Sequence, residues 1–293
     1  MKIRYSELFS SFQGEADFTG MPTIWLRLFG CNLQCNGFGQ KNPCDPSTHE
    51  LPYKTIDLSK ISTMMDLPVF TKGCDSGYSW SARFKKLAFD SNETELAEKI
   101  LRLADEQLGC TAWRHRVIGT HPQLAFTGGE PMMQQKAMVA ICKAIHESCG
   151  TTIPQVTIET NATKKLEECM SNMSLFDHVQ KLHIAMSPKL YNVSGEKNAV
   201  DLAVIDSYCA LADTVSIKFV HNGTEAAWKE LAAIEGHLKK LPEHVNLFLM
   251  YVGATKESQE VPEVKSFVER ALLHGYRISG RLHCHLLGNS MGT

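Results

Sequence analysis

The chain is dominated by an alternation of short apolar strands and helical segments that begins near residue 93 and continues to about residue 279. Each predicted strand is rich in β-branched or aromatic residues, and most are followed by a stretch with helical periodicity. This alternation favours a parallel sheet whose strands are connected by helices. The predicted strands, including one earlier run, are residues 23–29, 123–126, 155–158, 181–186, 214–220, 245–251 and 276–279. About seven strands suffice for a complete barrel, a partial barrel or an open doubly wound sheet, and periodicity does not choose among them.

Helices are predicted between these strands, and two regions lack a regular pattern. The helices are expected at 93–108, from Pro131 to about Cys149, from about Thr163, at 224–240 and at 260–274. Asn92 is predicted as the N-cap of the first helix. Residues 5–22 are predicted as a loop that ends in a turn. Residues 37–72 contain several prolines and no sustained periodicity, so they are predicted as an irregular excursion, which in a compact domain is usually functional or disordered.

Polar motifs follow four of the predicted strands. Cys31-Asn-Leu-Gln-Cys35 follows the first strand, Thr127-Gly-Gly-Glu130 follows the second, and Glu159-Thr-Asn161 and Ser187-Pro-Lys189 follow the next two. The carboxyl ends of parallel strands meet at one edge of a sheet, so we expect the four motifs to converge. A catalytic or binding site is therefore predicted at that edge.

The pair Cys31 and Cys35 could ligate a metal centre. Three thiolates on a 4Fe–4S cluster would leave one iron free to bind a small molecule, which distinguishes a reactive cluster from a sealed electron carrier. Two alternatives stay open from these residues alone. A free cysteine is most often a small buried apolar residue. A structural zinc site normally takes four ligands, often as two close pairs, and the second pair is missing here.

Two further features point to small charged groups as ligands. Arg27 is the single charge in the strand 23–29. It is predicted either to face water at a strand edge or to point inward toward a carboxylate, because a buried guanidinium needs an anionic partner. The Gly128-Gly129 turn would let a ligand approach the backbone, with the Glu130 carboxylate alongside to receive an ammonium group.

The composition argues against several classes of function. The chain has 43% hydrophobic residues and a formal net charge of -2, which favours neither nucleic acid nor an anionic membrane as partner. No stretch approaches the ~18 uncharged apolar residues of a membrane span, and the N-terminal residues lack the apolar segment of a secretory signal. Ten cysteines then indicate thiols and metal ligation rather than a disulfide framework. The cytoplasm is the expected compartment.

The motifs after the strands resemble those of radical S-adenosylmethionine (SAM) enzymes. The resemblance rests on Cys31-x3-Cys35 at a strand end, the turn Gly128-Gly-Glu-Pro131 after a later strand, and Ser187-Pro-Lys189 after another. Such enzymes normally carry Cys-x3-Cys-x2-Cys. Here Phe38 occupies the position of the third cysteine, so the usual motif is interrupted.

Residues farther along the chain resemble one branch of that class, the 7-carboxy-7-deazaguanine synthases or QueE family. Gln13-Gly-Glu15, Gly20-x-Pro22 and the segment Arg27 to Leu33 are similar to the N-terminus of that family. The family continues from its third cysteine as Cys-Asp-Thr-x-Tyr-Ala-Trp, and residues 74–80 read Cys-Asp-Ser-Gly-Tyr-Ser-Trp. We therefore predict that Cys74 is the third cluster ligand, displaced by an insertion at about residues 37–72. Cys44 is the rival, but the prolines beside it match nothing in the family.

The resemblance implies a single domain over residues 1–293 with the partial (β/α) barrel of radical SAM enzymes. It implies a 4Fe–4S cluster, SAM and Mg²⁺ as cofactors, and reductive cleavage of SAM to a 5′-deoxyadenosyl radical. The implied substrate is 6-carboxy-5,6,7,8-tetrahydropterin, whose ring contracts with loss of ammonia to 7-carboxy-7-deazaguanine. A homodimer is expected, together with an electron donor such as flavodoxin or ferredoxin and no direct contact with nucleic acid or membrane.

The resemblance also assigns roles to individual residues. The cluster ligands are Cys31, Cys35 and Cys74. The residues expected to contact SAM are Gly73, Asp75, Gly129, Glu130, Ser187 and Lys189. The substrate is expected to be held by Phe12, Gln13, Gly14, Arg27 and Thr127, with Arg27 paired to its carboxylate. Ser76 replaces a threonine whose hydroxyl is associated with Mg²⁺ in the family, and it keeps the oxygen.

Other functions remain as alternatives at this stage. A glycyl-radical activating enzyme would share the cysteines and the Gly-Gly-Glu turn, although Gln13-Gly-Glu15 and Arg27 count against it. A non-catalytic metal-binding module, or a relative inactivated by the interrupted motif, would retain the cysteines without turnover. Among the histidines, His183 and His221 are expected to be core residues, and only His283 is considered for substrate contact.

Overall fold

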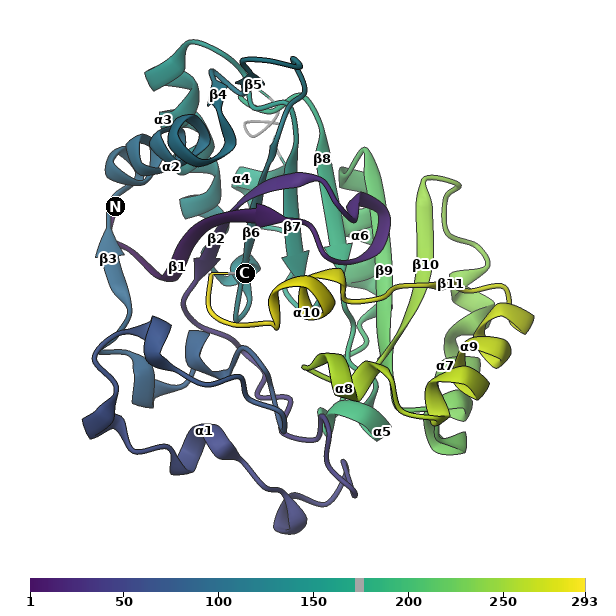
Figure 1. Cartoon of the computed structure of the whole chain (residues 1–293). Coiled ribbons are helices and arrows are strands. Elements are labelled where there is room, and N and C mark those ends of the chain that lie inside the picture. The colour runs from purple at the N-terminus through teal and green to yellow at the C-terminus, as the bar shows by residue number, and fades with distance from the viewer. Residues whose placement is uncertain (172–176, 293) are drawn as a thin grey trace.

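The computed structural model describes residues 1–171 and 177–292, which form a large sheet flanked by helices (Figure 1). The strands of the sheet are β1 (Ile3–Phe12), β2 (Pro22–Leu28), β3 (Phe89–Ser91), β6 (Gln123–Gly128), β7 (Val156–Thr160), β8 (Leu182–Met186), β9 (Thr214–His221), β10 (Val245–Tyr251) and β11 (Arg277–Ile278). A separate two-stranded sheet pairs β4 (Cys110–Thr111) with β5 (Arg114–His115).

The helices connect these strands. The longer ones are α2 (Glu93–Leu108), α3 (Gln135–Cys149), α6 (Leu202–Leu211), α7 (Glu225–Leu238) and α9 (Glu263–Leu273). The short ones are α1 (Pro52–Thr55), α4 (Glu168–Ser171), α5 (Tyr191–Ser194), α8 (Lys256–Gln259) and α10 (Leu282–Leu287). Single 3₁₀ turns lie at Ala16–Phe18, Pro46–Thr48, Leu58–Lys60, Met64–Asp66, Gly77–Ser79, Ala82–Phe84 and Pro131–Gln134.

The large sheet has the topology of a partial barrel. Its nine strands follow the order β11-β10-β9-β8-β7-β6-β2-β1-β3. Every neighbouring pair from β2 to β11 is parallel, whereas β1 and β3 add an antiparallel edge. Within the described residues the edge strands β3 and β11 do not pair, so the barrel is open. The arrows of the central parallel strands β6, β7 and β8 point toward the half of the molecule that holds α5, α8, α10 and the segment around α1 (Figure 1).

All seven predicted strands are confirmed, and two other predictions are wrong. Residues 5–22 are not a loop, because β1 extends to Phe12; a register shift between Tyr5 and Glu7 interrupts its two-residue period and hid the strand. The helix expected from Thr163 begins only at Glu168. The Asn161 side chain accepts a hydrogen bond from the Thr163 backbone N–H at 3.1 Å, a local turn that competes with helix formation.

The predicted helices are otherwise confirmed, with changes at their ends. The Asn92 side chain caps α2 as expected, accepting from the backbone N–H of Glu95 at 3.0 Å. The helix after Pro131 starts as a 3₁₀ turn, and the segment 260–274 is helical only from Glu263. The helix α6 was not predicted, because it is apolar on most sides and gives little periodicity.

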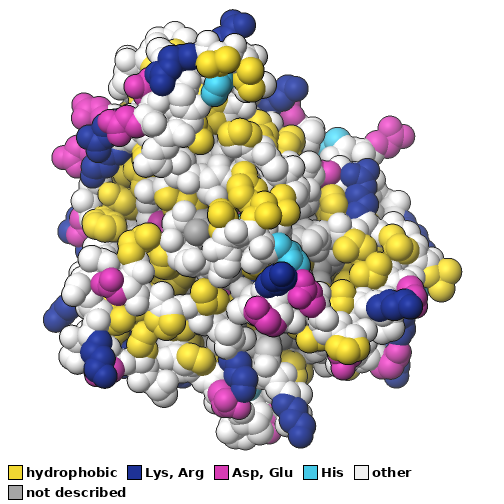
Figure 2. Space-filling model, viewed as in Figure 1, with side chains coloured by type: hydrophobic (Ala, Val, Ile, Leu, Met, Phe, Trp, Pro, Cys, Tyr) yellow, Lys and Arg dark blue, Asp and Glu magenta, His cyan; other side chains and the backbone are white. Residues whose placement is uncertain are grey.

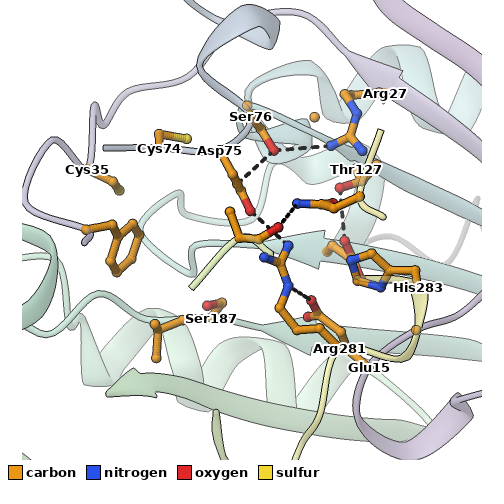
Figure 3. Close-up of a pocket in the computed structure, with 18 of the residues that line it drawn as sticks. Glu15, Arg27, Cys35, Cys74, Asp75, Ser76, Thr127, Ser187, Arg281 and His283 are labelled. Atoms are coloured by element: carbon orange, nitrogen blue, oxygen red, sulfur yellow. Dashed lines mark hydrogen bonds and ion pairs between the residues drawn. The ribbon is translucent and has the colours of Figure 1, made fainter. Parts of the chain in front are cut away.

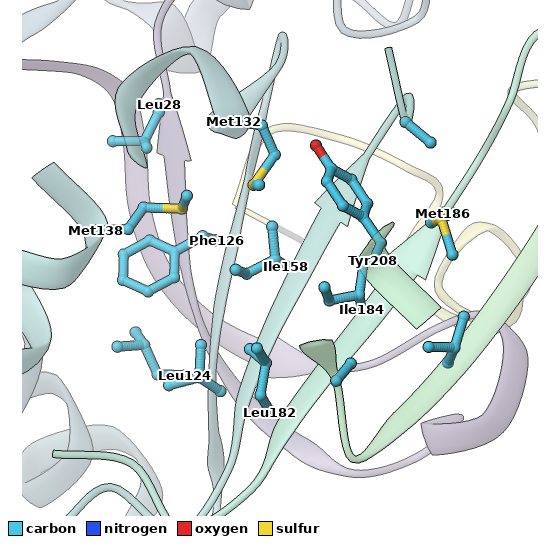
Figure 4. Packing of buried hydrophobic residues seen from close by; sticks show 14 of the residues in the cluster. Leu28, Leu124, Phe126, Met132, Met138, Ile158, Leu182, Ile184, Met186 and Tyr208 are labelled. Atoms are coloured by element: carbon cyan, nitrogen blue, oxygen red, sulfur yellow. The ribbon is translucent and has the colours of Figure 1, made fainter. Parts of the chain in front are cut away.

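The sheet alternates between a buried face and a cavity face. Leu124 and Phe126 of β6 pack into the main core with Ile158, Leu182 and neighbouring side chains (Figure 4). Thr127, the residue after Phe126, points to the opposite side and lines a cavity. Successive side chains on a strand point to opposite faces, so the same strands that build the core present polar groups on the inner face.

Residues 37–72 are irregular, as expected, but they are closed at the base and packed. The backbone N–H of Gly73 donates to the carbonyl of Phe38 at 2.8 Å, so the chain leaves and returns at one point. Gln40 exchanges two hydrogen bonds with the Glu50 backbone, at 2.7 and 3.1 Å. A second apolar cluster, separate from the main core, comprises Tyr53, Met64, Leu67, Phe70, Tyr78, Phe84 and Met291. The insertion therefore packs against the segment that carries Cys74.

On the face shown in Figure 2, acidic and basic side chains are interspersed, and no large patch carries charge of only one sign. This agrees with the formal net charge of -2. Among the described helices, none combines the length and the apolar character that crossing a bilayer requires.

His183 is a core residue, as predicted, and makes stability depend on pH. It is buried between β8 and β9, where its ring nitrogens meet Thr214 Oγ1 at 2.9 Å and Ser216 Oγ at 3.2 Å. Burial lowers the pKa of His183 to about 4.

A folded-state pKa below the unfolded value means that stability is present above about pH 6.5 and is lost as the pH falls toward 4. Because of His183, we expect the free energy of unfolding to be about 2 kcal/mol lower at pH 5 than at pH 7.5. Urea unfolding at both pH values, with His183→Asn as comparison, measures this loss. Equal pH dependence in the wild type and the variant would contradict the assignment.

Candidate active site

A cavity of about 270 Å³ opens at the carboxyl ends of the parallel strands. Its walls come from β1, β2 and the strands from β6 to β10, from the cysteine loops, and from the C-terminal segment around His283. Figure 3 shows labelled side chains from these separate segments pointing into one space. The convergence predicted from the polar motifs is confirmed, because residues of all four motifs line this cavity.

The thiols of Cys31, Cys35 and Cys74 all border the cavity, and no disulfide links any of the described cysteines. Burial raises the pKa of Cys31 to about 11 and that of Cys74 to about 12, and it raises the pKa of Cys35 well above its usual range. Such thiols become thiolates only when a cation offsets the charge, as a metal cluster does. The Cys44 thiol faces elsewhere and donates to the carbonyl of Tyr191 at 3.5 Å.

Glu196 fixes the loop that carries Cys35. One carboxylate oxygen of Glu196 accepts hydrogen bonds from the backbone N–H of Gln34 at 2.7 Å and of Cys35 at 2.6 Å. Cys35 has a φ angle of 51°, a left-handed conformation that costs free energy in a non-glycine residue. The two hydrogen bonds compensate for this cost and orient the thiol. Sequence reasoning did not identify Glu196, which lies far along the chain from the cysteines.

The segment after Cys74 is tied to the barrel in three places. The backbone N–H of Gly30 donates to the carbonyl of Ser79 at 2.8 Å, and the Tyr78 hydroxyl donates to Glu7 at 3.1 Å. The guanidinium of Arg281 donates to the carboxylate of Asp75 at 2.8 Å. These contacts hold the cysteine that the insertion separates from the first two.

A buried network of charges crosses the cavity (Figure 3). Arg281 donates through Nε to Glu15 at 2.9 Å and through Nη2 to Asp75, and Lys218 contacts the other oxygen of Glu15. Burial opposes ionisation of Asp75, but the charge and hydrogen bond of Arg281, together with smaller contributions from Arg27 and Ser76, outweigh it and lower the pKa of Asp75. Glu15, Lys218 and Arg281 were not predicted site residues, although Glu15 stands in a segment that resembles the QueE family.

The Arg27 side chain points inward toward a carboxylate, which is the second of the two orientations predicted from its position in the strand. Its Nε donates to Glu7 at 2.6 Å, its Nη1 lies 3.5 Å from Ser76 Oγ, and its guanidinium lies 5.7 Å from the centre of the Tyr78 ring. Glu7 is thus the buried anionic partner that Arg27 needs within the protein. Ser76 also donates to Asp75 at 3.2 Å.

Glu159 organises the polar side chains expected to hold the substrate. Its carboxylate accepts from Gln13 Nε2 at 3.3 Å and from Thr127 Oγ1 at 3.0 Å. Gly14 lies against the ring of His283, and a Cβ at residue 14 would stand 2.0 Å from His283 Nδ1. His283 therefore lines the cavity, in agreement with its selection among the histidines.

The Gly-Gly-Glu turn lies beside the first cysteine. A Cβ on Gly129 would stand 2.3 Å from the carbonyl oxygen of Gly30, so only glycine fits there. The carboxylate of Glu130 is buried and accepts from the backbone of Met132 at 2.9 Å and Asn161 at 2.6 Å, and from Thr160 Oγ1 at 2.7 Å. It holds the turn together and does not border the cavity. Its expected contact with SAM stays a prediction.

The remaining predicted residues all border the cavity. Lys189 donates to Ser187 Oγ at 2.9 Å and lies 5.7 Å from the centre of the Phe38 ring. Phe12 and Gly73 are also part of the wall. Of the residues proposed for the site, only Glu130 is absent from the wall.

Within the described residues, no three His, Cys, Asp or Glu side chains are placed to ligate a single metal ion. A four-iron cluster binds each thiolate through a different iron, so its ligands need not converge on one point. The three cavity thiols and the partial barrel are the features that the resemblance to radical SAM enzymes leads us to expect.

Within that class, the chain is similar to 7-carboxy-7-deazaguanine synthases. Such a protein from Pyrobaculum aerophilum is 22% identical over 292 residues, which is 99% of this chain and 97% of the relative. One from Hyperthermus butylicus is 28% identical over 160 residues, 54% of this chain and 43% of the relative. One from Rickettsia prowazekii is 38% identical over 60 residues, covering 20% of this chain and 22% of the relative. The last two matches thus span less than half of those relatives.

The crystal structure of QueE from Escherichia coli has the same fold, with a TM-score of 0.54 at 20% identity over 97% of this chain and 95% of that one. No family model matches the chain. The chain thus resembles 7-carboxy-7-deazaguanine synthases in sequence and shares the fold of QueE.

Proposed function

We propose that the chain is a 7-carboxy-7-deazaguanine synthase that converts 6-carboxy-5,6,7,8-tetrahydropterin to 7-carboxy-7-deazaguanine and ammonia. The observation that carries the proposal is one cavity that joins three cysteine thiols to a wall of charged and amide side chains. The reaction balances without an external oxidant, because the product plus ammonia contains all atoms of the substrate. A sealed electron carrier would not need this polar cavity beside its cluster.

The donor set fits a 4Fe–4S cluster, because three thiols from two loops share the cavity. Cys31, Cys35 and Cys74 would ligate it. When bound, the cluster and SAM supply the one-electron chemistry that starts the reaction. The SAM contacts are proposed for Gly73, Asp75, Gly129, Glu130, Ser187 and Lys189.

The substrate would lie among Arg27, Gln13 and Thr127. The guanidinium of Arg27 is a fork suited to a carboxylate, and its pairing with Glu7 keeps it oriented. Glu159 fixes the amide of Gln13 and the hydroxyl of Thr127, so that both present defined groups to a pterin ring. Phe12 and Gly14 complete this part of the wall.

Mg²⁺ is proposed at Ser76. The Ser76 hydroxyl is a hard oxygen donor next to the Asp75 carboxylate, and substrate oxygens would complete the coordination. The 3.5 Å approach of the Arg27 guanidinium to Ser76 Oγ means that an anionic substrate group is needed to separate the two cations. We also propose a cytoplasmic homodimer, with flavodoxin or ferredoxin as electron donor.

The proposal is tested by anaerobic reconstitution with iron and sulfide, followed by assays with SAM and 6-carboxytetrahydropterin. We expect a 4Fe–4S spectrum and formation of 7-carboxy-7-deazaguanine. Cleavage of SAM without conversion of the pterin would retain the radical SAM class and reject the substrate. Zinc without iron or sulfide would reject both.

Replacing Arg27 by lysine is expected to weaken substrate binding. Lysine keeps the charge beside Glu7 but loses the fork that binds a carboxylate through two hydrogen bonds. We expect the KM for the pterin to rise about tenfold to a hundredfold, since a hydrogen bond to a charged group contributes about 1.5–3 kcal/mol. Arg4→Lys, at the exposed pair with Asp90, is the control. An unchanged KM in Arg27→Lys would remove Arg27 from the substrate site.

A further inference from the structure

Trp80, a residue of the cavity wall, carries a buried hydrogen-bond donor without a partner. Among the described residues, its indole Nε1 is one of the buried side-chain atoms that lack any hydrogen bond. None of the others in that group belongs to a residue of the cavity wall. Buried N–H groups in proteins nearly always have an acceptor, so an unpaired one that borders a cavity indicates a ligand atom that accepts from it.

A candidate for that acceptor is the sulfur of Cys74, with which the Trp80 side chain interacts. The Trp80 side chain lies within interaction range of the Cys74 thiol, although the indole N–H does not reach normal hydrogen-bond geometry. A thiol is a weak acceptor, whereas a thiolate bound to iron carries negative charge and accepts strongly. The donor is therefore positioned for the ligated form of Cys74.

The insertion fixes the orientation of this indole. Tyr53, from α1, packs edge-on against the Trp80 ring with the ring centres 5.3 Å apart. Tyr53 is itself buried, and its hydroxyl donates to the Asn36 side chain at 3.2 Å, next to Cys35. The indole thus lies between a side chain of the insertion and the third cysteine.

We propose that Trp80 is a positioning residue for the cluster: its indole N–H donates to the sulfur at Cys74, and Tyr53 of the insertion holds it in place. The inference rests on the proposed cluster. A hydrogen bond to a cluster sulfur stabilises the reduced, more negative state more than the oxidised state, and such bonds are among the factors that set cluster potentials. The insertion then does more than separate Cys74 from the first two cysteines, since its Tyr53 supports the Trp80 indole that donates to the sulfur of Cys74.

The test is an EPR-monitored redox titration of the reconstituted protein. In Trp80→Phe a smaller aromatic ring replaces the indole and the N–H is lost, so the ratio of reduced to oxidised cluster at a fixed potential should fall about threefold to tenfold. Iron content should be unchanged. Trp113→Phe removes another unpartnered indole N–H that does not border the cavity and should leave the ratio unchanged. Tyr53→Phe should also leave it unchanged, whereas Tyr53→Ala should lower it.

A second measurement needs no change at Trp80. In protein labelled with ¹⁵N-tryptophan, pulsed EPR of the reduced cluster should detect a ¹⁵N coupling. Trp25 is the other tryptophan of the cavity wall. The coupling should therefore persist in Trp25→Phe. Unchanged potential in Trp80→Phe, or absence of that coupling, overturns the inference and leaves the proposed function intact. A wild-type protein that takes up no iron–sulfur cluster overturns both.

Discussion

Cys74→Ala is expected to abolish cluster binding and all SAM cleavage, whereas Cys44→Ala should leave both unchanged. The Cys74 thiol shares the cavity with Cys31 and Cys35, while the Cys44 thiol is directed at the backbone of Tyr191. A cluster with only two thiolates loses a covalent anchor that no other described cysteine of the cavity wall can replace. The loss should therefore be complete rather than partial.

The two variants are compared after anaerobic reconstitution, by iron and sulfide content, by the visible absorbance of the cluster and by SAM cleavage. We expect about four irons per chain in the wild type and in Cys44→Ala, and none retained through gel filtration in Cys74→Ala. A Cys74→Ala protein that keeps its cluster, or a Cys44→Ala protein that loses it, would refute the displaced motif.

The position of Cys74 follows from how the insertion closes. Phe38 stands where the usual motif has its third cysteine, and its carbonyl accepts from the N–H of Gly73, the residue before Cys74. A Cβ on Gly39 would stand 3.7 Å from the Lys72 Cα, so the two ends run side by side. A long insertion can therefore enter the motif with little displacement of the ligand that follows it. Loop length alone adds little to the entropy of closing such a loop.

The strand and helix pattern could be predicted because it depends on local periodicity. The seven parallel strands are buried on at least one face and read as apolar runs, and Asn92 capped its helix as its position suggested. β1 was missed for a local and a nonlocal reason. Its register shift interrupts the two-residue period, and it buries Glu7, a charge that Arg27 on the neighbouring strand helps to stabilise.

The cavity wall could be predicted in part, by two different routes. The convergence of motifs at the strand ends, and the inward direction of Arg27, followed from general properties of parallel sheets and of buried charges. Glu196 and Lys218 were missed, since each acts on residues far away in the sequence: Glu196 on Cys35, and Lys218 on Glu15. Neither stands in a motif, so only the folded chain identifies them.

Arg281→Met is expected to destabilise the fold by about 3–5 kcal/mol at neutral pH, as removal of one partner from a buried ion network usually does. Arg281 is the buried cation that joins Glu15 to Asp75, and it also donates to the carbonyl of Gly253 at 2.8 Å. Methionine fills similar space but leaves Asp75 without a cation at 2.8 Å. The matched control is Arg277→Met, because Arg277 pairs with Asp17 at 3.2 Å with its side chain 59% exposed, and such surface pairs contribute at most about 1 kcal/mol.

The pH dependence of this loss separates an electrostatic role of Arg281 from simple packing. Arg281 lowers the pKa of Asp75 against the opposing effect of burial. The stability that this ion pair provides is therefore fully present above the pKa of Asp75 in the unfolded chain, about 3.9. It is lost as the pH falls through the lower pKa of Asp75 in the folded protein. In Arg281→Met only the smaller effects of Arg27 and Ser76 remain against burial, so Asp75 should take up a proton at mildly acidic pH and recover part of the loss. Urea unfolding of both proteins at pH 7.5 and pH 5 should therefore show a smaller difference at pH 5. A difference that does not change with pH would assign the loss to packing, and a loss no larger than that of Arg277→Met would remove Arg281 from the support of the site.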